Sequence, residues 1–236
     1  MRILCIALIA SVAACAPDEK NTVRADGGQA AAAAGPEARR ESNRRATKVL
    51  FVGTSLTAGY GLTPELAYPS VVSRLAAADG HPIEPVNAGV SGETSAGALR
   101  RMDWVLRSPA DVIVIETGAN DALRGLDPDS TRANLRRIIA RVREAQPRAE
   151  LVLVQMEAPP NYGIAYVRRF REMYRDVARE ERVELAPFLL DGVAGLPELN
   201  QADGIHPNRR GAELVAANVW EALKPVVQRV ETSARD

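Results

Sequence analysis

The 236-residue sequence has few cysteines, few histidines and only 4% aromatic residues. Cys5 and Cys15 both lie within the first fifteen residues, so the remainder of the chain has neither a disulfide nor a thiolate metal site. His81 and His206 are far apart and belong to no metal-ligand motif, so we expect no metal and no organic cofactor. The scarcity of aromatic side chains argues against a stacking platform for single-stranded nucleic acid.

An excess of charge of one sign is also absent, because 30 basic side chains balance 30 acidic ones. Neither a basic patch nor an acidic tract stands out, so we expect no nucleic-acid partner. The apolar run from Ile3 to Val12 is too short to cross a bilayer as a helix. The length suits one domain with a large core, and we expect a monomer.

The first fifteen residues have the pattern of an export signal. Arg2 precedes the apolar run, and Val12-Ala-Ala-Cys15 resembles a bacterial lipoprotein box, in which small residues precede a lipidated cysteine. We therefore expect a signal peptide over residues 1–14, a lipid anchor on Cys15, attachment to a membrane and a periplasmic or cell-envelope location. An ordinary secretory peptide cleaved near the same place is the alternative.

The composition changes near residue 47. Residues 15–46, which begin with the cysteine of the expected anchor, are rich in alanine, glycine, proline and charge without sustained apolar periodicity, and we interpret them as a flexible tether. Alternating strand and helix patterns follow over residues 47–231. Residues 232–236 are expected to form a short tail.

Five apolar runs in this domain predict strands, and five amphipathic segments between them predict helices. Val112-Ile-Val-Ile115 is continuously apolar, as expected of a strand covered on both faces. The alternation implies an α/β fold, a three-layer αβα sandwich around a five-stranded parallel sheet. We expect Asp129 or Ser130 to cap the third helix. The predicted strands are 48–53, 83–88, 111–116, 150–156 and 183–188, and the predicted helices lie near 69–79, 95–107, 130–145, 164–181 and 208–230.

Polar residues follow four of the predicted strands. Ser55 comes after the first, Gly92 after the second and Asn120 after the third. Asp203 and His206 follow the fifth strand, beyond a further segment. Because the carboxyl ends of parallel strands meet at one edge of a sheet, we expect these residues to be neighbours.

This set of groups suits acyl transfer. The Ser55 hydroxyl needs a base to become a nucleophile, and His206 can serve if Asp203 holds its other ring nitrogen. The backbone N–H groups of Ser55 and Gly92, with the side-chain amide of Asn120, can stabilise an oxyanion. Taken singly, each residue has a plainer interpretation as a helix cap or a turn residue.

Three further features stay open. Glu93 and Glu116 lie near the same edge, but a general-acid pair is disfavoured because neither has a clear partner carboxylate. His81 precedes a proline at a strand start, and we assign it no role. The loop over residues 157–163 is either a lid beside the acyl pocket or a plain connection.

Four sequence blocks resemble, in order, those of the SGNH, or GDSL-type, hydrolase family of esterases and lipases. They are Gly53-Thr-Ser-Leu56, Gly89-Val-Ser-Gly92, Gly118-Ala-Asn-Asp121 and Asp203-Gly-Ile-His206. Extended matches such as Leu56-Thr-Ala-Gly-Tyr-Gly-Leu62 are similar to the branch of arylesterases and thioesterase/lysophospholipase enzymes. The resemblance covers roughly residues 47–230. Its one departure is Thr54, which stands where the family usually has an aspartate.

The resemblance implies a flavodoxin-like SGNH hydrolase fold and a serine esterase that cleaves small acyl or aryl esters, or thioesters, through an acyl-enzyme intermediate. One alternative is a non-catalytic lipoprotein that binds ligands on a degenerate hydrolase fold. Another is a flavodoxin-like module that holds phosphate at Gly53–Gly61, although that loop lacks the Gly-x-x-x-x-Gly-Lys pattern.

Overall fold

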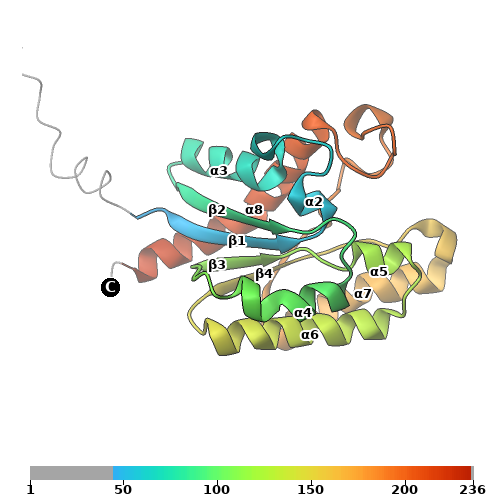
Figure 1. Ribbon diagram of the computed structural model, residues 1–236, viewed down its shortest axis with the longest axis horizontal. Coiled ribbons are helices and arrows are strands. Elements are labelled where there is room, and N and C mark those ends of the chain that lie inside the picture. The colour runs from blue at the N-terminus through green and yellow to red at the C-terminus, as the bar shows by residue number, and fades with distance from the viewer. Residues whose placement is uncertain (1–44, 235–236) are drawn as a thin grey trace, which may run out of the picture. The chain divides into compact units, whose positions relative to one another are not determined.

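A computed structural model of the chain describes residues 45–234 (Figure 1). The expected signal peptide, the lipidation site Cys15 and nearly all of the expected tether lie outside the described residues.

The domain is built on one sheet of five parallel strands in the order β2-β1-β3-β4-β5. This confirms the predicted sheet. Val52 near the end of β1 pairs with Ala88 on one side and Ile115 on the other, so three strands end close together. The strands are β1 (Thr47–Gly53), β2 (Ile83–Gly89), β3 (Val112–Ile115), β4 (Glu150–Val154) and β5 (Glu184–Ala186).

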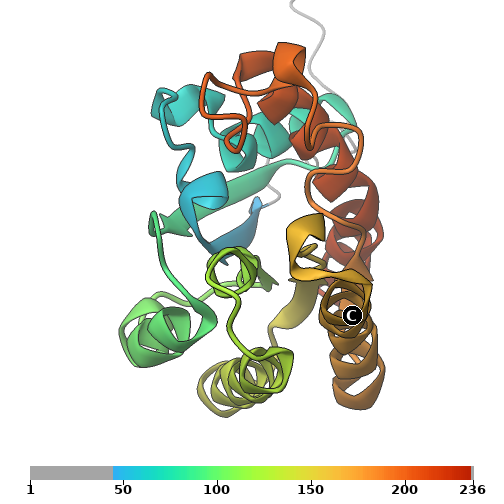
Figure 2. The ribbon, with the colours of Figure 1, turned by 90° about the vertical axis from the view of Figure 1, so that its right-hand side faces the viewer.

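Helices cover both faces of the sheet, as predicted (Figures 1 and 2). On one face, α3 (Tyr68–Ala78) packs against α8 (Arg209–Ser233). On the other face, α6 (Pro128–Ala145) lies between α4 (Ser95–Val105) and α7 (Ile164–Glu181). Within residues 45–234, no helix is both long enough and apolar enough to cross a membrane.

Several loops contain short helical segments. The sequence did not predict α2 (Ser55–Ala58) or α5 (Ala119–Leu123), which directly follow β1 and β3. Single 3-10 turns form at Pro64–Leu66, Pro160–Tyr162 and Pro197–Leu199. Segments of three to five residues are too short to show helical periodicity in sequence.

The core lies between the sheet and the two helical layers. The ring of Phe51, in the middle of β1, meets the ring of Tyr68 edge to face, with centroids 5.8 Å apart. On the opposite face, the predicted apolar stripe of α6 is fully buried. That stripe consists of Leu135, Ile138, Ile139 and Val142.

Two helix boundaries differ from the predictions. Asp127, rather than Asp129 or Ser130, caps α6, because Pro128 suits the first helical position and draws the start of the helix forward. At the other end of the domain, α8 continues to Ser233, past the predicted end of the last helix near residue 230. Glu231 is nearly buried there and accepts from His81 Nδ1 at 2.9 Å, which ties the last turn to the start of β2.

Candidate active site

Ser55 is the first residue of α2, directly beyond the carboxyl end of β1. Thr54 caps this short helix, since its side chain accepts a weak bond from the Leu56 N–H at 3.5 Å. Gly59 ends the helix with a φ of 75°, a left-handed conformation that glycine adopts without strain. The strand, the cap and the single helical turn therefore hold the serine hydroxyl at the edge of the sheet.

The three residues predicted for nucleophilic chemistry form one hydrogen-bonded chain. Ser55 Oγ lies 2.8 Å from His206 Nε2, and His206 Nδ1 lies 2.7 Å from Asp203 Oδ2. The topology thus brings Ser55 into contact with a residue 151 positions away.

The electrostatics of Asp203 set the proton positions in this chain. Its Oδ1 accepts the backbone N–H groups of His206 at 3.0 Å and Ile205 at 2.9 Å. The N–H of His206, then its ring and then the N–H of Ile205 lower the pKa of the Asp203 carboxyl to about 2. An ionised carboxylate only accepts hydrogen bonds, so Nδ1 carries the ring proton and Nε2 is free to accept from Ser55.

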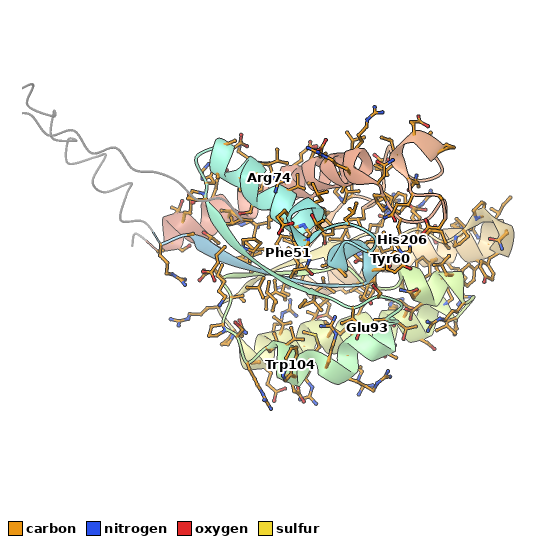
Figure 3. The ribbon with its side chains drawn as sticks, turned by 45° about the horizontal axis from the view of Figure 1, so that its top comes forward. Phe51, Tyr60, Arg74, Glu93, Trp104 and His206 are labelled. Carbon is orange, nitrogen blue, oxygen red and sulfur yellow. The ribbon has the colours of Figure 1, made fainter. Side chains whose placement is uncertain are left out.

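Two residues that the sequence did not single out hold His206 in place. The backbone N–H of Gln201 donates to the His206 carbonyl at 2.7 Å. Its side-chain Nε2 donates to the Tyr60 carbonyl, also at 2.7 Å. The ring of Tyr60 lies beside the imidazole, with centroids 4.5 Å apart and planes inclined by 37° (Figure 3). No motif marks Gln201, and only its place in a Gly-Tyr-Gly turn distinguishes Tyr60.

The predicted oxyanion donors lie on the same edge. Gly92 adopts a φ of 76°, and its carbonyl accepts from Arg124 Nη2 at 2.9 Å. Asn120 uses one amide hydrogen to donate to the Glu93 carbonyl at 3.0 Å, which leaves its second hydrogen for another acceptor. Gly92, Asn120, Ser55 and His206 all line one pocket, so the predicted juxtaposition is present. Their role as oxyanion donors stays a prediction.

That pocket has a volume of about 350 Å³ and mostly apolar walls. Glu157 and Pro159, from the loop over residues 157–163, line part of it. The Glu157 carboxylate accepts hydrogen bonds from Nε and Nη2 of Arg171. The Tyr162 hydroxyl donates to the Leu123 carbonyl at 2.9 Å, so hydrogen bonds hold the loop at two points. The apolar wall consists mainly of Leu56, Leu123, Met156, Phe188, Leu190 and Ile205.

Glu93 and Glu116 are engaged in separate tasks. Glu93 forms a bidentate ion pair with Arg101, which also donates to the Gly53 carbonyl at 3.3 Å. Glu116 is fully buried, and desolvation raises its pKa to about 7. These contacts argue further against a general-acid pair. In the part of the chain that the structure describes, no group of three or more potential metal ligands occurs.

Known proteins are similar to this chain in sequence and in fold. A model of the GDSL-like Lipase/Acylhydrolase family matches residues 51–214. The chain is 38% identical over 184 residues to Esterase TesA of Pseudomonas aeruginosa, covering 77% of this chain and 90% of that protein. It is 36% identical over 183 residues to Thioesterase 1/protease 1/lysophospholipase L1 of Escherichia coli K12, covering 77% and 86%. The crystal structure of TesA matches with a TM-score of 0.72 at 37% identity, covering 76% of this chain and 99% of that one.

Proposed function

The chain belongs to the GDSL-like lipase/acylhydrolase family, and we propose that it is a serine esterase with Ser55 as nucleophile, His206 as base and Asp203 as the residue that orients the base. The observation that carries the proposal is the hydrogen-bonded chain from Asp203 through His206 to Ser55, with links of 2.7 and 2.8 Å. A serine hydroxyl within reach of an oriented base is the arrangement that acyl transfer requires.

The reaction proceeds in two halves. Ser55 Oγ attacks the carbonyl carbon of the substrate while His206 Nε2 takes the hydroxyl proton. The N–H groups of Ser55 and Gly92, with the Asn120 amide, stabilise the oxyanion. His206 then gives the proton to the leaving alcohol or thiol, and the acyl-enzyme remains. Water attacks this ester and passes a proton to His206, which returns it to Ser55 Oγ as the acid leaves. No step requires a metal or an organic cofactor.

The substrate class follows from the walls of the pocket. Six apolar side chains and a volume of about 350 Å³ suit the apolar acyl or aryl part of a small ester, with the scissile bond at Ser55. Relatives whose names include esterase, thioesterase and lysophospholipase support oxygen esters and thioesters as substrates. We propose the same range for this chain, within the arylesterase and thioesterase/lysophospholipase branch.

Hydrolysis of p-nitrophenyl butyrate by the purified protein tests the proposal. Ser55→Ala is expected to abolish turnover and to keep the circular dichroism spectrum and melting temperature. Retained turnover in Ser55→Ala would sink the mechanism.

We further propose that the protein is exported and anchored to a membrane through lipidated Cys15. The support is Arg2, the apolar run from Ile3 to Val12 and the Val12-Ala-Ala-Cys15 pattern. The full chain with Cys15→Ala should move from the membrane fraction to the soluble fraction. Continued sedimentation of this variant with membranes would contradict the anchor.

A further inference from the structure

A buried carboxylate lies directly beneath the turn that carries Ser55. Glu116, just past the end of β3, accepts the backbone N–H of Thr54 at 2.9 Å and the Thr54 hydroxyl at 3.0 Å. It also accepts the Thr57 hydroxyl at 2.8 Å, and that oxygen lies 2.9 Å from the Tyr68 hydroxyl. All four residues are at most 2% exposed, so these bonds are shielded from water.

Gly53 makes this close approach possible. A Cβ at residue 53 would lie 2.6 Å from Glu116 Oε2 and would also overlap the Thr57 hydroxyl. The backbone of Gly53 is not in the left-handed region, so space rather than conformational freedom requires glycine here. The glycine that ends β1 therefore admits the carboxylate against the turn.

The bonds of Glu116 reach both sides of the nucleophile. Thr54 precedes Ser55 and caps α2, whereas Thr57 lies two residues after it in the same helix. Glu116 belongs to the loop after β3, so its carboxylate fixes the rotation of α2 relative to the sheet. The direction of the Ser55 hydroxyl toward His206 depends on that rotation.

We propose that Glu116 is the positioning residue of the nucleophile turn, holding α2 so that the Ser55 hydroxyl stays aligned with His206. The inference rests on the proposed function. Glu116 acts through Thr54 and Thr57, and its side-chain bonds, as described for residues 45–234, go to the turn rather than to the reacting atoms.

Threonine at residue 54 suits this arrangement. An aspartate there would bring a second carboxylate against that of Glu116, and two like charges in one buried site do not both ionise. Thr54 instead supplies a hydroxyl donor to Glu116. The turn thus holds one carboxylate, that of Glu116.

The test compares kcat and KM for p-nitrophenyl butyrate at pH 8, where the Glu116 carboxyl is ionised. Glu116→Gln should lower kcat by roughly 10- to 100-fold, because a small displacement of a reacting group costs about this much. KM should change less than threefold, since Glu116 does not line the pocket. The matched control is Glu231→Gln, a change of another buried carboxylate at the far end of α8, which should leave kcat within twofold.

Rescue separates positioning from general destabilisation. Thr54→Asp in the Glu116→Gln background returns a carboxylate to the turn and should raise kcat at least fivefold over Glu116→Gln alone. Thr54→Val removes the hydroxyl that donates to Glu116 and accepts the weak bond from the Leu56 N–H, and it should lower kcat by several-fold. This variant decides the question if Glu116→Gln does not fold.

An unchanged kcat in the folded Glu116→Gln enzyme, or a double variant no more active than Glu116→Gln, would overturn the inference. If Glu116→Gln does not fold, an unchanged kcat in Thr54→Val would do so. Such results leave the proposed function standing as long as Ser55→Ala is inactive. A wild-type protein without esterase activity would instead remove the function itself.

Discussion

Asparagine in place of Asp203 isolates the electrostatic part of the orienting contact. The two side chains have the same shape, and the Oδ1 of asparagine can still accept the N–H groups of Ile205 and His206. The loop should therefore keep its conformation. At the other branch, an NH2 group would replace the oxygen that lies 2.7 Å from His206 Nδ1.

That replacement reverses the tautomer of the imidazole. The amide of asparagine can only donate toward Nδ1, so Nδ1 must be unprotonated and the ring proton moves to Nε2. Nε2 then donates toward Ser55 Oγ and is no longer free to take its proton. In a fully buried triad the same exchange costs about 10⁴ in turnover. Because the Asp203 side chain is 38% exposed, water can partly take over its contact with the imidazole. We therefore expect a loss of about 10³ in turnover for Asp203→Asn.

A loss of about 10³ corresponds to about 4 kcal/mol of transition-state stabilisation. The measurement is kcat/KM for p-nitrophenyl butyrate at pH 8, together with the melting temperature. Asp79→Asn is a matched control, because Asp79 is 40% exposed and accepts from Trp220 and Lys224 away from the pocket. The control should keep full activity. If Asp203→Asn retained more than a tenth of wild-type kcat/KM, water alone would orient His206 well enough.

Two further predictions concern Tyr60 and the titration of Glu116. Tyr60→Leu removes the ring that lies 4.5 Å from the imidazole, and kcat should fall roughly two- to fivefold because the imidazolium loses a cation–π contact. Tyr60→Phe keeps the ring and should match wild type. Equal kcat values for the leucine and phenylalanine variants would refute this prediction. Burial raises the pKa of Glu116 from 4.5 to about 7, so the folded state retains a proton that the unfolded chain has lost. The stability that this group contributes is present below about pH 4.5 and is lost as the pH rises through 7. Between pH 4 and 8, the free energy of unfolding in urea should therefore fall by about 3 kcal/mol more for wild type than for Glu116→Gln. The same pH dependence of this free energy in both proteins would contradict the assigned pKa.

The sequence predicted the sheet and the long helices because each has a strong periodic signal. A continuous apolar run such as Val112–Ile115 is typical of a strand covered on both faces. The apolar stripe of α6 repeats at helical spacing. Boundaries shifted where one residue outweighed the pattern, as Pro128 does at the start of α6. The helices α2 and α5 were not predicted, because segments of four or five residues are too short to show helical periodicity.

The candidate site was predictable to the extent that topology alone determines it. A parallel sheet brings the ends of its strands to one edge, which is enough to make Ser55, Asp203 and His206 neighbours. Gln201 was not predictable, since it donates to the backbone carbonyls of Tyr60 and His206, and any residue type has such a carbonyl.

Glu116 shows why the sequence conveys less about the layer beneath the site. A carboxylate directly after the buried run Val112–Ile115 must either reach water at the edge or find donors inside. The donors belong to Thr54 and Thr57, at the cap and within the single turn of α2, which no sequence pattern links to β3. Yet the topology that gathers the reactive groups at the edge also gathers the residues one step below them. Glu116, directly after the continuously apolar β3, is therefore a partner of the turn after the neighbouring strand β1, which carries Ser55.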